Sequence, residues 1–293
     1  MDGPSIAADA QPSILLGRYQ LLERIGEGGM GVVWRCFDLD LEEPVAIKFL
    51  REEFSRDEAL RASFRREVKL ARRVTHPNVT RMYELGRDGE VYFLTMEYVA
   101  GESLQARLAR EGRLPVELVA ALGLGLSRGL AAAHAAGVVH GDIKPGNVLI
   151  SPGRGAVLTD FGVARVLSEA HLVGAEDWGG TPLYMAPEQF LSSALSMPCD
   201  VHAFGVLLFE ALTGEAPWPN HDMGALIAAK YSDEPDLGAL AHGFHPAWRA
   251  LIADCLHRDP ERRPPDGRAL LARLAALRGA ASPGPTSPVP TTG

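Results

Sequence analysis

Residues 139–150 read VHGDIKPGNVLI, and residues 160–162 read DFG. The apolar runs 148–150 and 156–159 predict a short hairpin that closes across residues 151–155. Closing that hairpin would place Asn147 beside Asp160, although thirteen positions separate them in the chain. Two oxygen ligands held together suit Mg²⁺, which takes few protein ligands and fills its remaining positions with water and phosphate. The stretch therefore predicts a magnesium site.

The same stretch carries two further polar residues whose spacing has a chemical interpretation. Asp142, five residues before Asn147, is placed to orient a hydroxyl group and to accept its proton. Lys144 can neutralise a phosphoryl group during its transfer. A polar loop with an Asp-Asn turn is the simpler interpretation, but it does not account for the spacing to Asp160.

Residues 25–33 read IGEGGMGVV, a glycine-rich pattern that lets backbone amides approach phosphate oxygens closely. Dinucleotide-binding folds share this pattern, but in those folds a helix follows the glycines. Here residues 32–34 read VVW and continue as a strand, so the pattern predicts a loop that joins two strands and covers phosphates. An ordinary hairpin turn would need only two or three residues, fewer than this run.

Residues 45–48 read VAIK, a predicted strand with a lysine at its end. A solvated strand end would explain Lys48 by itself, but the predicted helix 56–74 carries a carboxylate on its apolar face. That face is formed by residues spaced three or four apart: Leu60, Phe64, Glu67, Ala71 and Val74. Because burying Glu67 without a partner would be costly, the pattern predicts that Glu67 pairs with Lys48.

A β-rich first part and a helical second part predict a two-lobed α+β protein with a ligand-binding cleft between the lobes. The predicted strands are 19–25, 32–38, 44–50, 82–87 and 91–98, with the helix 56–74 among them. The predicted helices of the second lobe are 115–136, 200–212, 223–229, 246–256 and 267–277. The lobes are predicted to join near residues 99–102.

These motifs, together with APE at residues 186–188, resemble the protein kinase family in their order and spacing. The resemblance covers about residues 18–278 and is closest to the bacterial eukaryotic-like (Hanks-type) serine/threonine kinases, through GTPLYMAPEQ at residues 180–189. It implies a protein kinase fold, with a β-rich N-lobe holding one helix over about 18–98 and an α-helical C-lobe over about 102–278. It also implies a non-specific serine/threonine protein kinase that uses ATP and Mg²⁺ and acts on protein substrates.

The resemblance assigns roles to individual residues. It implies that ATP is bound by Ile25, Gly26, Glu27, Gly28, Gly29, Met30, Gly31, Val32, Val33, Ala46, Lys48, Met96, Glu97, Val99 and Leu149. Among these, Glu97 and Val99 would contact adenine through their backbone, and Met96 would be the gatekeeper. The implied catalytic residues are Lys48, Glu67, Asp142 and Lys144, and the implied metal ligands are Asn147 and Asp160. Asp200 would brace the run from His140 to Asn147, here called the catalytic loop.

The implied substrate platform consists of Thr181, Glu188 and Arg263, with Glu188 paired to Arg263. Lys144 two residues after Asp142, and Thr181 in the platform, are typical of the serine/threonine branch rather than the tyrosine branch of the family.

The sequence departs from the usual family pattern at Gly141, where most members have an arginine. That arginine pairs with a phosphate on the activation segment, and glycine cannot do so. Between residues 162 and 180 the only hydroxyl side chain is that of Ser168, although Arg165 could receive a phosphate. We therefore expect an enzyme that does not need activation-segment phosphorylation. His202 and Ala203 also depart from the aromatic-serine pair common in the family, and we expect their role to be structural.

Two other functions are alternatives to a protein kinase. Small-molecule kinases, such as aminoglycoside and choline phosphotransferases, share a His-Gly-Asp motif with a later asparagine, but they lack the platform with Thr181 and Arg263. A pseudokinase scaffold would require loss of Lys48, Asp142 or one of the implied metal ligands, and none is lost.

The composition narrows the partners and the compartment. The formal net charge of −8 argues against nucleic-acid binding. The three cysteines, which are Cys36, Cys199 and Cys255, are widely spaced and predict buried free thiols in a reducing compartment. Residues 1–17 lack the pattern of a signal peptide. The longest stretch rich in apolar residues, 118–139, contains Ser127, Arg128 and His134 and is therefore not expected to span a membrane. We expect a cytoplasmic protein with no membrane span.

The two ends of the chain are predicted to lie outside the kinase domain. Residues 1–17 would form a flexible N-terminal extension, and residues 280–293, rich in Pro, Ser and Thr, would be disordered. Ser282, Thr286 and Ser287 are candidates for autophosphorylation. The sequence leaves homodimerisation open.

Overall fold

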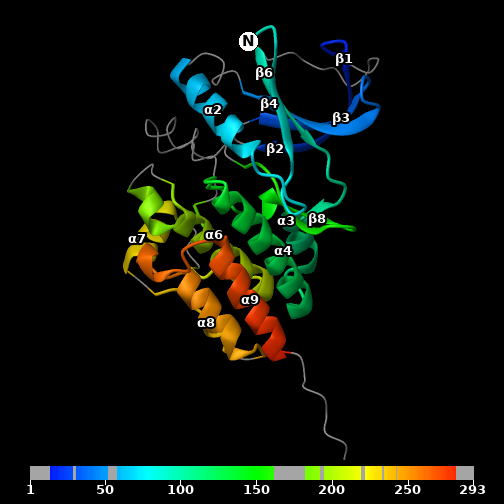
Figure 1. Ribbon diagram of the computed structural model, residues 1–293. Coiled ribbons are helices and arrows are strands. Elements are labelled where there is room, and N and C mark those ends of the chain that lie inside the picture. The colour runs from blue at the N-terminus through cyan, green and yellow to red at the C-terminus, as the bar shows by residue number, and fades with distance from the viewer. Residues whose placement is uncertain are drawn as a thin grey trace, which may run out of the picture.

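The protein has two lobes, a β-sheet lobe that carries helix α2 and a helical lobe, in a computed structural model shown in Figure 1. The structure describes residues 14–28, 31–51, 58–161, 182–191, 195–218, 222–232, 234–241 and 243–281. This arrangement confirms the predicted two-lobed α+β architecture.

The N-lobe is built on a six-stranded antiparallel sheet in the order β1-β2-β3-β4-β6-β5. Its strands are β1 (Ile14–Leu15), β2 (Tyr19–Gly28), β3 (Gly31–Asp38), β4 (Glu43–Leu50), β5 (Met82–Asp88) and β6 (Val91–Glu97). The five predicted strands all occur. Strand β1 was not predicted, and it pairs with β2 inside the stretch expected to be a flexible extension.

The glycine loop is tighter than the sequence predicts. Strand β2 continues to Gly28, which pairs with Gly31 of β3, so the two strands are separated by two residues, as in an ordinary hairpin. Gly31 has a φ of 147°, and a Cβ at this position would lie 1.7 Å from the carbonyl oxygen of Phe49 on β4. Only glycine allows the neighbouring strand to approach this closely.

Helix α2 (Glu58–Ala71) packs against β5. Its buried side chains include those of Phe64, Val68 and Ala71, and Val74 is buried just beyond its end. The predicted apolar face is therefore the face that covers the sheet.

The C-lobe contains the helices α3 (Leu104–Glu111), α4 (Val116–Ala135), α6 (Met197–Thr213), α7 (Met223–Ser232), α8 (Pro246–Cys255) and α9 (Gly267–Ala281). A three-stranded sheet of β7 (Glu102–Ser103), β8 (Val148–Ser151) and β9 (Gly155–Leu158) lies at the top of this lobe. Strands β8 and β9 form the predicted hairpin. Helix α3 was not predicted individually, because eight residues give little periodic signal.

Helix α4 lies at the centre of the C-lobe. It packs against α9, β9 and α6, and among the described helices it is the one long and apolar enough to cross a membrane by length and composition. In its most apolar window, 56% of the residues are buried inside the lobe. The packing therefore accounts for its apolar character as that of a core helix.

All three cysteines are buried and free, as predicted.

Candidate active site

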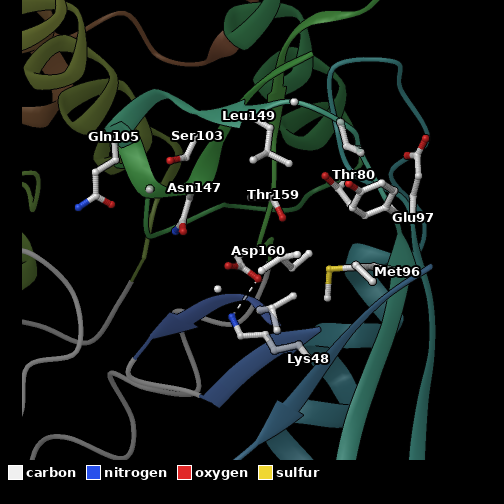
Figure 2. Close-up of a pocket in the computed structure, with 18 of the residues that line it drawn as sticks. Lys48, Thr80, Met96, Glu97, Ser103, Gln105, Asn147, Leu149, Thr159 and Asp160 are labelled. Carbon is white, nitrogen blue, oxygen red and sulfur yellow. Dashed lines mark hydrogen bonds and ion pairs between the residues drawn. The ribbon is translucent and has the colours of Figure 1, made fainter. Parts of the chain in front are cut away.

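A cavity of about 500 Å³ opens between the two lobes, and Figure 2 shows the side chains that line it. Fifteen of the residues implied by the sequence line it: Ile25, Gly26, Glu27, Gly31, Val33, Ala46, Lys48, Met96, Glu97, Val99, Asp142, Lys144, Asn147, Leu149 and Asp160. They come from the glycine hairpin, β4, the end of β6 and the residues just after it, the loop after α4, β8, and the segment after β9. The fold thus brings together residues that are more than a hundred positions apart.

Among the implied ATP-binding, catalytic and metal-binding residues in the described part of the chain, three do not line this cavity. Val32 neighbours Val33 on β3, and alternating side chains of a strand point to opposite faces, so only Val33 faces the cavity. Gly28 lies at the tip of the hairpin, and Glu67 lies on α2. Gly29 and Met30 lie outside the described residues.

The cavity has further lining residues that the sequence analysis missed: Thr80, Tyr98, Gly101, Ser103, Gln105, Gly146 and Thr159. Those between residues 98 and 105 lie between or shortly after the predicted adenine contacts Glu97 and Val99. Their position in the chain could therefore have predicted that they line the cavity. The hydroxyl oxygen of Thr80 is buried without a hydrogen-bond partner among the described residues. No local pattern marks Thr80, because its place in the cavity depends on how the segment before β5 pairs with the end of β9 at Leu158.

Lys48 contacts Asp160 in the structure. Its ammonium lies 2.9 Å from Oδ1 of Asp160, and the Lys48 side chain is 7% exposed. The contact with Asp160 was not predicted from the sequence. The predicted pairing of Lys48 with Glu67 stays a prediction.

Asp160 is poised as an anion at the back of the cavity. Burial opposes its ionisation, but the positive charge of Lys48 and the hydrogen bond from Lys48 outweigh this, so that the pKa of Asp160 is below its ordinary value. Its φ of 64° is in the left-handed region, which is uncommon for a residue other than glycine. Such backbone strain is often found at functional sites.

The catalytic loop holds Asp142 through one of its two carboxylate oxygens. Oδ2 accepts a hydrogen bond from Nδ2 of Asn147 at 2.8 Å and lies 2.7 Å from Nζ of Lys144. The Asn147 amide nitrogen also donates to the backbone oxygen of Asp142, at 2.8 Å. Neither contact uses Oδ1 of Asp142.

The predicted brace by Asp200 is confirmed. Its carboxylate, on α6, accepts hydrogen bonds from the backbone nitrogens of His140 at 2.8 Å and Gly141 at 2.7 Å, and lies 2.9 Å from Nε2 of His134. Gly141 has a φ of 79°, which glycine adopts without strain. Two backbone donors on one buried carboxylate fix the start of the catalytic loop.

His140 links the catalytic loop to the segment that carries Asp160. Its Nε2 lies 2.9 Å from the carbonyl oxygen of Thr159, and its ring centroid lies 4.4 Å from that of Phe161. Nδ1 of His140 accepts a hydrogen bond from the backbone nitrogen of Asp142. The proton of this ring is therefore on Nε2.

The donor set at the end of the cavity fits Mg²⁺. The amide nitrogen of Asn147 is used by Asp142, which leaves Asn147 Oδ1 as a ligand, and Asp160 supplies carboxylate oxygen. The described residues contain no group of three or more His, Cys, Asp or Glu side chains that could hold a metal. A site with two protein oxygens suits Mg²⁺, which keeps several waters and binds phosphate oxygens.

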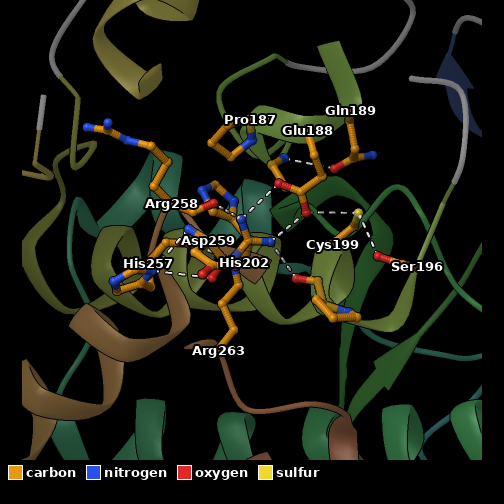
Figure 3. Close-up of polar contacts among 12 residues, drawn as sticks. Pro187, Glu188, Gln189, Ser196, Cys199, His202, His257, Arg258, Asp259 and Arg263 are labelled. Atoms are coloured by element: carbon orange, nitrogen blue, oxygen red, sulfur yellow. Dashed lines mark hydrogen bonds and ion pairs between the residues drawn. The ribbon is translucent and has the colours of Figure 1, made fainter. Parts of the chain in front are cut away.

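A second polar cluster, shown in Figure 3, is centred on Glu188 and Arg263. Arg263 donates through its two terminal nitrogens to the two carboxylate oxygens of Glu188, at 2.7 and 2.8 Å, as predicted. The Arg263 side chain is 0% exposed. Burial opposes ionisation of Glu188, but the hydrogen bonds and charge of Arg263 prevail and keep its pKa below the ordinary value. Thr181 lies outside the described residues.

The chain is similar to known protein kinases. The family described as "Protein kinase domain" matches residues 19–271. The chain is 37% identical to the serine/threonine-protein kinase PknA of Mycobacterium tuberculosis over 254 residues, which make up 85% of this chain and 58% of PknA. It is 32% identical to a probable serine/threonine-protein kinase of Clostridium acetobutylicum over 253 residues, 86% of this chain and 38% of that protein. This chain spans less than two thirds of the length of each of these two relatives.

The fold is similar to that in the crystal structure of Rad53 1–466 in complex with AMP-PNP. The TM-score is 0.74 at 22% sequence identity, and the match covers 87% of this chain and 64% of that one. This likeness establishes the architecture of the two lobes.

Proposed function

Because the chain belongs to the protein kinase family, in its bacterial Hanks-type serine/threonine branch, we propose that it transfers the γ-phosphoryl group of ATP to serine or threonine hydroxyls of proteins. One observation carries this proposal furthest. Asp142, at the mouth of a cavity between the lobes, is held through Oδ2 by Asn147 and Lys144, and Oδ1 is left for a substrate hydroxyl. This is the arrangement that a proton acceptor for phosphoryl transfer requires.

These groups account for each bond and proton of the proposed transfer step. The hydroxyl oxygen of the substrate forms a bond to the γ-phosphorus, and the bond from that phosphorus to the oxygen bridging the β- and γ-phosphates breaks. The hydroxyl proton passes to Oδ1 of Asp142, and ADP leaves. Lys144, now 2.7 Å from Asp142, is close enough to neutralise charge on the transferring group.

The cavity walls support a role in ATP binding. Val33, Ala46 and Leu149 would hold the adenine ring, and the backbone of Glu97 and Val99 would bind its edge. The glycine hairpin would cover the phosphates with its backbone amides. Bound Mg²⁺, held by Asn147 and Asp160, would neutralise the phosphate oxygens.

Lys48 would change partner when the nucleotide binds. Its contact with Asp160 occupies the carboxylate that the proposed metal site needs. Once Asp160 is committed to that site, the ammonium would bind the phosphates and could pair with Glu67, which is the role the sequence implied for that residue. This exchange is part of the proposal.

The substrate platform implied by the sequence includes the segment 182–191, which carries Glu188, and this segment alone is called the platform from here on. Together with Thr181 it would dock the protein substrate. Its anchor is the Glu188–Arg263 pair, buried at the arginine end. Such a platform favours a protein substrate over the small molecules phosphorylated by aminoglycoside-type kinases, the second candidate function. We propose that the protein works in the cytoplasm and also phosphorylates itself.

The test uses labelled ATP with magnesium, in the absence and presence of dephosphorylated casein, with Asp142→Asn in parallel. We expect the wild type to transfer label to protein. The rate of transfer should be lower in the variant by a factor of about 100 or more, as is typical for loss of a general base. Label confined to small molecules would support the second candidate. No label at all would support a scaffold and would overturn the proposal.

Independence from activation-segment phosphorylation has a separate test. Gly141 cannot bind a phosphate through a side chain, so Ser168→Ala should leave the transfer rate to casein within about twofold, a change of less than 1 kcal/mol in the barrier. A large fall in activity of the purified variant would show that this idea is mistaken.

A further inference from the structure

Helix α7 carries a lysine that points into the protein toward the platform. Lys230 is 1% exposed, one of the few fully buried charged side chains of the described residues. Its ammonium donates hydrogen bonds to the backbone oxygens of Leu183, at 2.6 Å, and Met185, at 2.5 Å. Both carbonyl groups belong to the platform, so one side chain fixes its backbone at two points.

The next residue of α7 adds a third contact. The hydroxyl of Tyr231 donates to the backbone oxygen of Pro187 at 2.5 Å. Helix α7 therefore binds the platform backbone from residue 183 to residue 187, directly before the Glu188–Arg263 anchor.

One aromatic ring lies beside the ammonium, and a second ring stacks on the first. Nζ of Lys230 lies 4.9 Å from the ring centroid of Trp218, and the ring of His202 stacks on Trp218 with centroids 5.7 Å apart and an interplanar angle of 13°. Nδ1 of His202 lies 3.4 Å from the backbone oxygen of Tyr184, a third platform carbonyl. The side chain at the unusual position 202 thus belongs to the same cluster.

The charged and titratable groups that interact with Lys230, or on which it acts, come from three elements. His202 lies on α6, Glu188 on the short helix η2 (Pro187–Phe190), and Arg263 directly after η4 (Pro260–Arg262). Burial, with the charges of Lys230 and Arg263, keeps the pKa of His202 well below its ordinary value, so the imidazole is neutral. Burial and Arg263 lower the pKa of Lys230 to about 7, against an opposing effect of Glu188.

We propose that Lys230 is a positioning residue for the protein substrate: its buried ammonium fixes the backbone of the platform and thereby sets the affinity for a protein substrate without affecting ATP. This inference rests on the proposed role of the platform as the docking site. Near neutral pH the ammonium loses its proton, and the remaining neutral amine donates weaker hydrogen bonds than the charged group.

The first test compares wild type with Lys230→Met, which keeps the length of the side chain and removes its donors. We expect the KM for dephosphorylated casein to rise about tenfold, since two buried carbonyls lose their partner. The KM for ATP should stay unchanged, because Lys230 does not line the nucleotide cavity. Lys69→Met, at an exposed lysine of α2, is the matched control and should leave both KM values unchanged.

A second readout does not depend on kinase activity. Hydrogen–deuterium exchange over residues 182–191 should be faster in Lys230→Met than in the wild type, with unchanged exchange over residues 140–149. If Lys230→Met does not fold, Lys230→Gln, which keeps amide donors without the charge, takes its place and should show the same two changes to a smaller degree.

The pH profile separates positioning by charge from simple packing. For the wild type, the KM for casein should rise several-fold between about pH 6 and about pH 8, as Lys230 loses its proton. At each pH, the KM of the wild type is divided by the KM of Lys230→Met. Because both enzymes use the same casein, the ratio is not affected by the titration of casein itself. Tyr231→Phe, which loses one uncharged hydrogen bond, should keep the slope of the wild type.

The outcomes are distinct. Unchanged exchange over 182–191 in Lys230→Met overturns the inference, and so does faster exchange with an unchanged KM for casein. A flat profile of the KM ratio overturns the role of the charge. If the wild type transfers no phosphate to casein, the proposed function fails, while exchange still decides whether Lys230 fixes the platform.

Discussion

Arg263 shows at the residue scale how a buried charge holds the platform. Its side chain is 0% exposed and makes two hydrogen bonds to Glu188, with further bonds to the backbone oxygens of His257, Pro198 and Arg258. A guanidinium with all these partners is satisfied in the interior. Losing it would leave Glu188 without its cation.

We predict that Arg263→Ala lowers the free energy of unfolding by about 3 kcal/mol, since it breaks a largely buried ion pair by removing one partner. Urea unfolding followed by circular dichroism measures this change. The control is Arg273→Ala, whose pair with Asp254 is exposed at both ends and should contribute about 1 kcal/mol or less. Equal losses in the two variants would contradict the prediction.

The same pair makes stability depend on pH. The pKa of Glu188 is lower in the fold than its ordinary value of 4.5, so its ionised form favours the folded state. Its contribution is fully present above the unfolded pKa and is lost as pH falls through the folded pKa. Wild type should therefore exceed Glu188→Gln in unfolding free energy at neutral pH, and the difference should shrink toward zero in acid. A difference that stays constant down to the acid limit of the fold would rule this out.

Helix α9 illustrates the element scale, because its start is packed directly on α4. A Cβ on Gly267 would lie 2.4 Å from the backbone nitrogen of Ala131 and 2.6 Å from the carbonyl carbon of Leu130. The backbone nitrogen of Gly267 donates to Nδ1 of His134 on α4, at 3.0 Å. His134 in turn reaches the brace at Asp200, so the packing of α9 on α4 supports the catalytic loop.

Gly267→Ala should therefore destabilise the C-lobe by about 3 kcal/mol through overpacking against a backbone that cannot move easily. Differential scanning calorimetry should show a melting temperature lower by about 6 to 12 °C. Gly153→Ala is the control, since a Cβ there meets nothing within 4 Å. A variant at position 267 as stable as this control would refute the close packing.

At the scale of the whole molecule, the cavity between the lobes is the shared surface on which the proposed reaction depends. Its walls come from both lobes, with Lys48 from the N-lobe and Asp160 from the C-lobe already in contact. A ligand that fills the cavity would contact both lobes at once. Ligand binding and overall stability are therefore linked.

We predict that AMP-PNP with magnesium raises the melting temperature. At a ligand concentration of about 100 times Kd the gain is about 2.7 kcal/mol. That gain corresponds to a shift of about 5 to 10 °C for a domain of this size. Lys48→Met should reduce the shift strongly, because it removes a cation that would hold the phosphates. A full shift in that variant would argue against this placement of the phosphates.

The order of the elements and most of the cavity can be predicted from the sequence. The glycine pattern, VAIK, and the run from His140 to Asn147 each have a local signature, because glycine content, periodicity and short spacing are properties of neighbouring residues. Together with the family resemblance that they carry, these signatures predicted both lobes, the β8–β9 hairpin, and fifteen of the residues that line the cavity.

Which distant groups meet depends on the folded arrangement of the elements. That arrangement brought Lys48 to Asp160, turned Val32 away from the cavity, and placed Thr80 inside it. It also buried Lys230 beneath the platform, although a lysine near the end of a helix normally suggests a solvated charge. The physical reason is that partner choice depends on how whole elements pack, and a charge removed from water must take the partner which that packing supplies.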